Sequence, residues 1–167
     1  MARLENKTAV VIGAGSIGPG WGNGKATAVL CAREGARVVC ADVNEAAARE
    51  TAAIIEGEGG DAIATTADVT REDDVRRVVE TALARYGRID VLDNNVGIAV
   101  VGGVVELPLA EWERVLAVNL TSCFLTMKHV IPVMVAAGGG AIVNISSVSG
   151  IRYTGVPYAS YLSLIHI

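Results

Sequence analysis

The stretch VVIGAGSIGPGWGNGKA, residues 10–26, decides how this chain folds. It begins in an apolar run and ends in a helix-like segment, residues 25–30. Six glycines lie between them: Gly13, Gly15, Gly18, Gly20, Gly22 and Gly24. Glycines permit positive φ and let an anion approach the backbone closely, and a following helix directs free N–H groups at that anion. The stretch predicts a phosphate-binding loop, although a flexible turn between two core elements would show the same glycines.

Composition favours one globular domain of the α/β class. The chain has 167 residues, of which 51% are hydrophobic, and its mean hydropathy is +0.44. That length suits a single domain, and that hydropathy suits a parallel sheet covered on both faces. The net charge of −4 without a basic block argues against a nucleic-acid partner.

The apolar segments argue against a membrane protein. The longest one, residues 115–137, is interrupted by polar side chains and a proline: Asn119, Lys128, His129 and Pro132. It predicts a buried helix and no membrane span. No charged-then-apolar leader is present, so we expect no secretory signal. The three cysteines are scattered without a Cys-x-x-Cys pair, which favours free thiols in a reducing cytoplasm. The two histidines show no metal-ligand spacing, and no metal site is predicted.

Apolar runs alternate with amphipathic helical patterns along the chain. We predict strands at residues 7–12, 37–41, 62–66, 91–94 and 141–145. We predict helices at residues 23–34, 44–58, 71–86 and 109–137, with Pro132 able to kink or end the last. A polar loop is expected after residue 145. This alternation is typical of repeated βαβ units.

Asp42 is the second indication of a nucleotide site. It lies 18 residues after Gly24, at the end of the second predicted strand. An acidic residue there can bond both ribose hydroxyls of an adenosine. The same carboxylate would repel a 2′-phosphate, and no basic residue follows it, so NAD is favoured over NADP. A solvated aspartate at a strand end, or the N-cap of the second helix, is the alternative interpretation.

Several motifs, in order along residues 7–161, resemble those of the short-chain dehydrogenase/reductase family. Gly13-Ala14-Gly15 and GNGKA at residues 22–26 resemble the two halves of its glycine loop. Asp68-Val69 resembles the pair that contacts adenine, and NNVG at residues 94–97 resembles the motif at the end of the fourth strand. Asn119, Ser147 and Tyr161 match the catalytic asparagine, serine and tyrosine.

The resemblance implies a Rossmann-type, doubly wound parallel sheet with strand order 3-2-1-4-5. It also implies hydride transfer between NAD and a small alcohol or ketone, in a cytoplasmic homo-oligomer. The implied cofactor-binding residues are Gly13, Gly15, Ser16, Gly22, Asn23, Gly24, Asp42, Asp68, Val69, Asn95 and Gly97.

The implied catalytic residues suit that chemistry. A phenol, with a pKa of about 10, is a poor base at neutral pH unless a cation stabilises the phenolate. Tyr161 would exchange a proton with the substrate oxygen, Ser147 would hold that oxygen, and Asn119 would orient a water. The alternatives are a turn serine at a strand end and a helix amide satisfied by backbone. Tyr158 competes with Tyr161, but it lies too close to Ser147 for the family's spacing.

Three positions depart from the family pattern. The glycine loop is longer than usual, and its extra residues, 17–21, include Trp21. This indole could cover the cofactor or shield the loop. Asp93 replaces an apolar residue, and a carboxylate in a buried strand needs a partner or water. The family's lysine, four residues after the tyrosine, is replaced by Ile165, or by Leu162 if Tyr158 is counted instead.

The last six residues, LSLIHI at 162–167, do not resemble the family. They can be back-translated as CTG TCT CTT ATA CAC ATC, the transposase mosaic-end adapter of sequencing libraries. We therefore expect a Rossmann domain over residues 1–161 and an artefactual tail over 162–167. The chain would then lack the family's last two strands, the lysine-bearing helix and the substrate loop. The alternative is a naturally short paralogue that binds a nucleotide or a partner without turnover.

A domain without those elements would leave apolar surface uncovered. The last predicted strand, residues 141–145, would be an open edge that templates aggregation. The long helix over residues 109–137 would keep a partly bare apolar face. We expect poor solubility and marginal stability.

Overall fold

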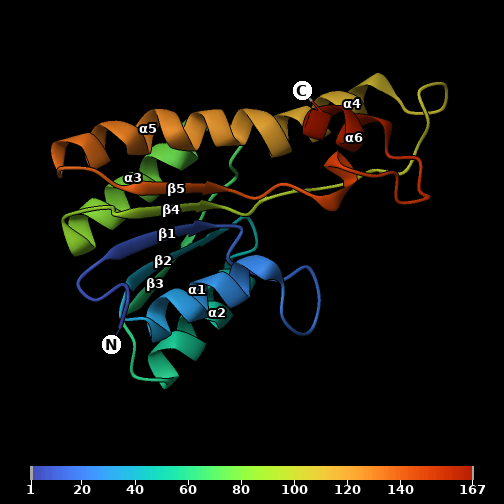
Figure 1. Cartoon of the computed structure of the whole chain (residues 1–167). Coiled ribbons are helices and arrows are strands. Elements are labelled where there is room, and N and C mark those ends of the chain that lie inside the picture. The colour runs from blue at the N-terminus through green and yellow to red at the C-terminus, as the bar shows by residue number, and fades with distance from the viewer. Residues whose placement is uncertain (1, 167) are drawn as a thin grey trace.

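Five parallel strands form the central sheet within residues 2–166, the part of the chain that this computed structural model describes. Their order across the sheet is β3-β2-β1-β4-β5 (Figure 1). The strands are β1 (Thr8–Ile12), β2 (Arg37–Asp42), β3 (Ala62–Thr66), β4 (Val91–Asn94) and β5 (Ala141–Asn144). The order reverses between β1 and β4, where open α/β sheets bind their ligands. The predicted fold class and strand order are confirmed.

Helices cover both faces of the sheet. On one face lie α1 (Asn23–Arg33) and α2 (Glu45–Gly57), and on the other lie α3 (Glu72–Tyr86) and α5 (Ser122–Ala136) (Figure 1). The remaining elements are α4 (Leu109–Leu116), a π turn (Ala117–Thr121), a 3₁₀ turn (Val148–Gly150) and α6 (Ala159–His166).

The core consists of two apolar layers, one on each face of the sheet. Val10 and Leu92 belong to the layer under α3 and α5, whereas Val11 and Val38 belong to the layer under α1 and α2. All four side chains are fully buried. Because neighbouring residues of a strand point to opposite faces, strands covered on both sides must be apolar throughout. This explains the uninterrupted apolar runs of the sequence.

Local signals placed most element boundaries well. The bounds of β3 and β4 are those predicted. The second helix begins after Asn44, whose side chain accepts a hydrogen bond from the Ala47 N–H at 3.3 Å, as expected of an N-cap. Gly87 ends α3 in the left-handed conformation, with φ of 75°.

The helix predicted over residues 109–137 is confirmed as a continuous helix over Leu109–Ala136, with a π turn at Ala117–Thr121 inside it and with Pro132 inside α5 without ending it. One prediction about the second half of the chain is wrong. The segment expected to be only a polar loop contains α6, so the expectation that the chain ends before this helix is wrong. Pro157 and the glycine at 155 obscured α6, because both residues are typical of loops.

The long helix is buried only along part of its surface, so the prediction of a buried helix is only partly confirmed. By length and composition alone, Leu109–Ala136 could cross a membrane. Val130 and Met134 of α5 enter the core. On its other side Phe124 is 58% exposed and Val135 is 71% exposed.

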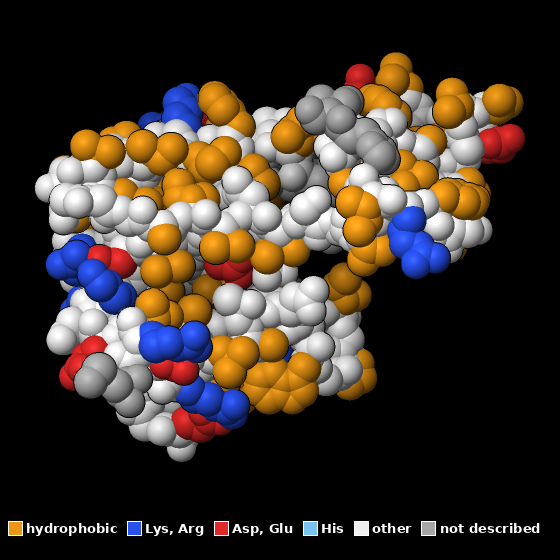
Figure 2. Space-filling model, viewed as in Figure 1, with side chains coloured by type: hydrophobic (Ala, Val, Ile, Leu, Met, Phe, Trp, Pro, Cys, Tyr) orange, Lys and Arg blue, Asp and Glu red, His pale blue; other side chains and the backbone are white. Residues whose placement is uncertain are grey.

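The β5 edge is also open. Val143 and Ile145 are about half exposed, and β5 is bonded to β4 alone within the described sheet. Figure 2 shows hydrophobic side chains gathered over the α5 and β5 region. The expected bare apolar surfaces are therefore present.

Candidate active site

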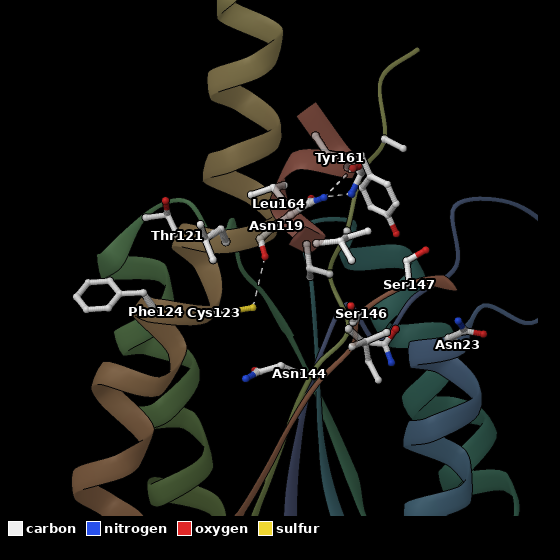
Figure 3. A pocket seen from close by; sticks show the side chains of 18 of the residues that line it. Asn23, Asn119, Thr121, Cys123, Phe124, Asn144, Ser146, Ser147, Tyr161 and Leu164 are labelled. Carbon is white, nitrogen blue, oxygen red and sulfur yellow. Dashed lines mark hydrogen bonds between the residues drawn. The ribbon is translucent and has the colours of Figure 1, made fainter. Parts of the chain in front are cut away.

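A cavity of about 870 Å³ lies at the carboxyl ends of β4 and β5, beside the start of α1. The three predicted catalytic residues, Asn119, Ser147 and Tyr161, all line it. Three of the predicted cofactor-binding residues line it too: Asn23, Asn95 and Gly97. Figure 3 shows the cavity between α1, α5 and α6. The fold thus gathers residues from distant parts of the sequence around one space.

The glycine loop packs tightly between β1 and α1. Gly13 has a φ of 79°, and a Cβ there would lie 2.9 Å from Val96 Cγ2. A Cβ on Gly15 would lie 2.6 Å from the Ala47 Cβ. These positions admit only glycine, because a side chain would meet the neighbouring elements. A Cβ on Gly24, in the first turn of α1, would overlap the Gly13 carbonyl oxygen, so the N-terminus of α1 lies directly behind the loop, in the arrangement that binds anions.

Ser16 closes the base of the long loop. Its hydroxyl accepts a hydrogen bond from the Gly22 N–H at 2.7 Å and donates to the Gly20 carbonyl at 3.3 Å. These two hydrogen bonds join the two ends of the loop, and residues 17–21 form the loop between them. Trp21, which is 59% exposed, lies with its ring 5.6 Å from Lys25 Nζ. The indole does not line the cavity.

Asp42 is joined to the glycine loop. Its Oδ2 accepts a hydrogen bond from the Gly15 N–H at 2.9 Å, and its Oδ1 accepts one from the Asn44 N–H at 2.9 Å. The N-cap of α2 is Asn44, so the alternative interpretation of Asp42 as that N-cap is wrong. The carboxylate lies at the end of β2, beside the loop, as an adenosine-binding acid requires.

Asp68 and Val69 lie outside the cavity, after β3. Asp68 Oδ1 accepts hydrogen bonds from the Thr70 N–H at 3.0 Å and the Thr70 hydroxyl at 2.7 Å. Val69 is buried in the core layer of α3. The predicted adenine contact of this pair stays a prediction.

Asn94, the last residue of β4, and Asn95, the next residue, face different partners. Asn94 donates from Nδ2 to Asn144 Oδ1 at 2.8 Å and accepts at Oδ1 from the Thr126 hydroxyl at 2.8 Å. Asn95 donates from Nδ2 to Asp93 Oδ2 at 3.0 Å. Asn94 therefore ties β4 to β5 and α5. Asn95 supplies the partner that the buried Asp93 was expected to need.

Asn119 holds the wall of the cavity. Its Oδ1 accepts a hydrogen bond from the Ile98 N–H at 2.9 Å, and its Nδ2 donates to the Ile98 carbonyl at 2.8 Å. The alternative of an amide satisfied by backbone is right, but that backbone belongs to the loop after β4, not to the helix. One hydrogen bond at each end leaves the amide a second N–H and a second lone pair, so its expected role in orienting a water stays a prediction.

Ser147 and Tyr161 both line the cavity. Ser147 Oγ accepts a hydrogen bond from the Ser149 N–H at 3.2 Å and caps the 3₁₀ turn. In Figure 3 the hydroxyl end of Tyr161 points toward Ser147. Tyr158 does not line the cavity, since its backbone pairs with Gly102. The geometry therefore favours Tyr161, as the sequence spacing did.

The cavity next to Tyr161 is apolar. Ile165, one helical turn beyond Tyr161 on α6, lines the cavity. A Cβ on Gly150 would collide with its Cγ2. Among the residues described, no lysine or arginine lines this cavity. The site therefore lacks the cation that would stabilise a phenolate.

Sequence reasoning missed the wall that the long helix contributes. It comprises Leu120 of the π turn and Cys123, Phe124 and Met127 of α5. Their spacing from Asn119 is that of one helix face. Helical periodicity counted from Asn119 could have found them.

A family model for the short chain dehydrogenases matches residues 7–163. The chain belongs to the short-chain dehydrogenase family. Its fold is the one that the sequence resemblance implied.

Sequence relatives of this short-chain dehydrogenase chain are longer than it is. A cyclohexanol dehydrogenase from Acinetobacter sp. (strain SE19) is 39% identical over 150 residues, which are 89% of this chain and 58% of that enzyme. A 3-oxoacyl-[acyl-carrier-protein] reductase from Thermotoga maritima is 39% identical over 149 residues, with the same two coverages. The chain thus spans little more than half the length of these relatives.

Solved structures of the family superpose closely. A protein from Burkholderia xenovorans, assigned as a short-chain dehydrogenase/reductase, has a TM-score of 0.95 and 47% identity, covering 99% of this chain and 66% of that one. A 7α-hydroxysteroid dehydrogenase complexed with NADH and 7-oxo glycochenodeoxycholic acid has a TM-score of 0.90 and 32% identity, covering 99% and 62%.

Proposed function

We propose that the whole protein is an NAD-dependent oxidoreductase that transfers hydride between nicotinamide and a small alcohol or ketone. The observation that carries this proposal is the convergence of Asn119, Ser147 and Tyr161 on one cavity at the switch point of the sheet. The relatives named as a cyclohexanol dehydrogenase and a 3-oxoacyl reductase support an alcohol or ketone substrate.

Asp42 supports NAD in preference to NADP. The Gly15 N–H holds its carboxylate at 2.9 Å, at the end of β2. A carboxylate fixed there can accept hydrogen bonds from two ribose hydroxyls, whereas a 2′-phosphate would meet a like charge. The nucleotide would be held by the glycine loop, Asn23 and Asp42.

The residues on the cavity divide the proposed chemistry among them. Bound NAD would supply the hydride acceptor or donor. Ser147 would donate a hydrogen bond to the substrate oxygen, and Tyr161 would exchange a proton with that oxygen. Asn119 would act through Ile98 by holding the loop after β4 as a wall.

A second candidate function is nucleotide or partner binding without turnover. Ile165 favours it for the chain as it stands, because an aliphatic side chain cannot stabilise a phenolate at Tyr161. Gain of activity on restoring a lysine at this position distinguishes the two candidates.

A cytoplasmic homo-oligomer completes the proposal. The described cysteines, Cys31, Cys40 and Cys123, are free thiols, which fits a reducing compartment. The exposed apolar side of α5, with Phe124 and Val135, offers a surface that a second copy could cover.

Turnover by the protein read from the intact genomic frame tests the proposed function. It should oxidise secondary alcohols with NAD⁺, and Ser147→Ala and Tyr161→Phe should each lower kcat by about 10²-fold or more. Tyr158→Phe is the matched control and should retain activity. Full activity of Tyr161→Phe, or none in the intact protein with any alcohol or ketone, would contradict the proposal.

We also propose that residues 162–167 derive from a sequencing adapter. The match of LSLIHI to the mosaic-end codons supports this origin. Resequencing the locus from genomic DNA tests it. A native stop codon directly after Ile167 would contradict it.

A further inference from the structure

Asp93 is a carboxylate in the interior of the sheet. It is the third residue of β4, in register with Val11 of β1 and Val143 of β5, and only 3% of it is exposed. Burying an ionised group among apolar neighbours costs free energy unless it is paired. Burial accordingly raises the pKa of the Asp93 carboxyl, with the Asn95 hydrogen bond opposing the shift. Asp93 itself does not line the cavity, so a role for it in the site must act through a neighbouring side chain that does.

The amide of Asn95 is the polar partner of this carboxylate. Asn95 Nδ2 donates to Asp93 Oδ2 at 3.0 Å. The main chain of Asn95 is fixed separately, because its N–H donates to the Ile12 carbonyl at 2.9 Å. Asp93 thus acts on the side chain of Asn95 alone.

The chemistry of the pair fixes the direction of the amide. An ionised carboxylate only accepts hydrogen bonds, so it admits the NH₂ end of Asn95 and rejects the oxygen end. The oxygen is consequently turned away from Asp93. Asn95 lines the cavity, and within residues 2–166 no donor is bonded to its Oδ1.

We propose that Asp93 is a positioning residue that locks the Asn95 amide so that its oxygen accepts a hydrogen bond from a ribose hydroxyl of the bound nucleotide. This inference rests on the proposed function for its ligand. An apolar residue at position 93, as in the family pattern, would leave the amide free to turn and present either end. Burial of Asp93 therefore costs some folding stability, and it holds the Asn95 oxygen as a fixed hydrogen-bond acceptor in the cavity.

Nuclear magnetic resonance of the full ¹⁵N-labelled chain tests the orientation directly. The side-chain NH₂ signal of Asn95 is assigned by its loss in Asn95→Asp. Asp93→Leu should shift this signal and speed its solvent exchange about tenfold, as expected when a hydrogen bond to a charged group is lost. Asp90→Asn is the matched control: it removes a buried carboxylate that pairs with Arg88, away from Asn95. An Asn95 signal unchanged by Asp93→Leu would overturn the inference.

NAD⁺ binding tests the consequence. Asp93→Leu should weaken binding about tenfold, and Asn95→Asp should weaken it at least as much, because two carboxylates then meet. The double variant Asp93→Asn/Asn95→Asp reverses donor and acceptor within the pair and still turns an acceptor to the cavity. It should recover binding to within a few-fold of the unmodified chain.

A purely structural role for Asp93 would give a different result. Asp93→Leu would then change thermal stability but not NAD⁺ affinity, and the double variant would not recover binding. Absence of NAD⁺ binding by the folded, unmodified chain would instead overturn the proposed function. In that case the Asn95 resonance still decides whether Asp93 orients the amide.

Discussion

Gly24 lies so close to Gly13 that a Cβ on Gly24 would overlap the Gly13 carbonyl oxygen. The contact joins the first turn of α1 to the end of β1. It leaves the N-terminus of α1 directly behind the glycine loop, where the backbone N–H groups and the helix dipole favour an anion. Because Gly24 has no side chain, α1 can pack closely against the end of β1. The same close packing places the helix N-terminus where a nucleotide phosphate would bind.

Gly24→Ala should destabilise the chain by about 1–3 kcal/mol, because an added methyl group must displace backbone. Gly57→Ala is the matched control. Gly57 is also helical, at the end of α2, and a Cβ there meets no atom within 4 Å. It should be neutral or stabilising by up to about 1 kcal/mol. Denaturant unfolding measures both, and equal free energies for the two variants would contradict the packing argument.

Glu72 should make the fold sensitive to acid. Hydrogen bonds to Glu72 Oε1 from Lys128 at 2.8 Å and His129 at 2.8 Å lower the pKa of this carboxyl. A depressed folded-state pKa means that its stabilisation is present above the unfolded pKa, about 4.3. That stabilisation is lost as pH falls through the folded value.

Glu72→Gln should therefore lower stability at pH 7 and reduce its decline between pH 5 and 3. The free energy of unfolding measured across that range checks the prediction. Glu80→Gln is the control, since Glu80 is exposed on the same helix and forms no ion pair among the described residues. An unchanged pH profile in Glu72→Gln would show that the contact does not bind α3 to α5.

Ile165→Lys should bring activity to the chain. The side chain at 165 lines the cavity one turn from Tyr161, and a cation there would favour the phenolate. We expect alcohol-dependent NADH formation to rise by about 10²-fold or more. Leu162→Lys is the control, because Leu162 lies on α6 but does not line the cavity. Equal rates in both variants would argue that the missing cation is not the limiting defect.

The open apolar surface should cause self-association. Val135 on α5 and Val143 on β5 are 71% and 47% exposed. Val135→Glu combined with Val143→Lys should lower light scattering at high concentration, since charge blunts an open sheet edge. Val43→Lys changes a residue that is 69% exposed but lies beyond β2. If Val43→Lys lowers the scattering equally, the effect is one of added charge in general, and the α5 and β5 surface is not the cause of self-association.

Local sequence signals predicted the first two thirds of the fold well. The glycine loop, the Asn44 cap and the apolar strands all depend on residues close together in the chain. Each of these features predicts the same local structure whatever the tertiary fold. The position of Asp42 also followed, because a strand of known start must end beside the loop that precedes it.

The parts that the sequence did not predict depend on distant contacts. Asn119 bonds Ile98 across 21 residues of sequence, and only the packing of the long helix on the sheet brings them together. The α6 helix and the wall of the cavity that the long helix contributes are likewise tertiary features. Asp93 departs from the family pattern. Its role could be inferred only from its hydrogen bond to Asn95 and from the position of Asn95 on the cavity.

Calorimetric titration of the folded 167-residue chain with NAD⁺ and with NADP⁺ tests the central claim most directly. We predict that NAD⁺ binds and that NADP⁺ binds at least about tenfold more weakly, because the Asp42 carboxylate meets the 2′-phosphate. Asp42→Ala should remove most of that difference, while a cooperative thermal transition confirms that the variant folds. Tighter binding of NADP⁺, or no binding of either nucleotide to the folded chain, would contradict the account.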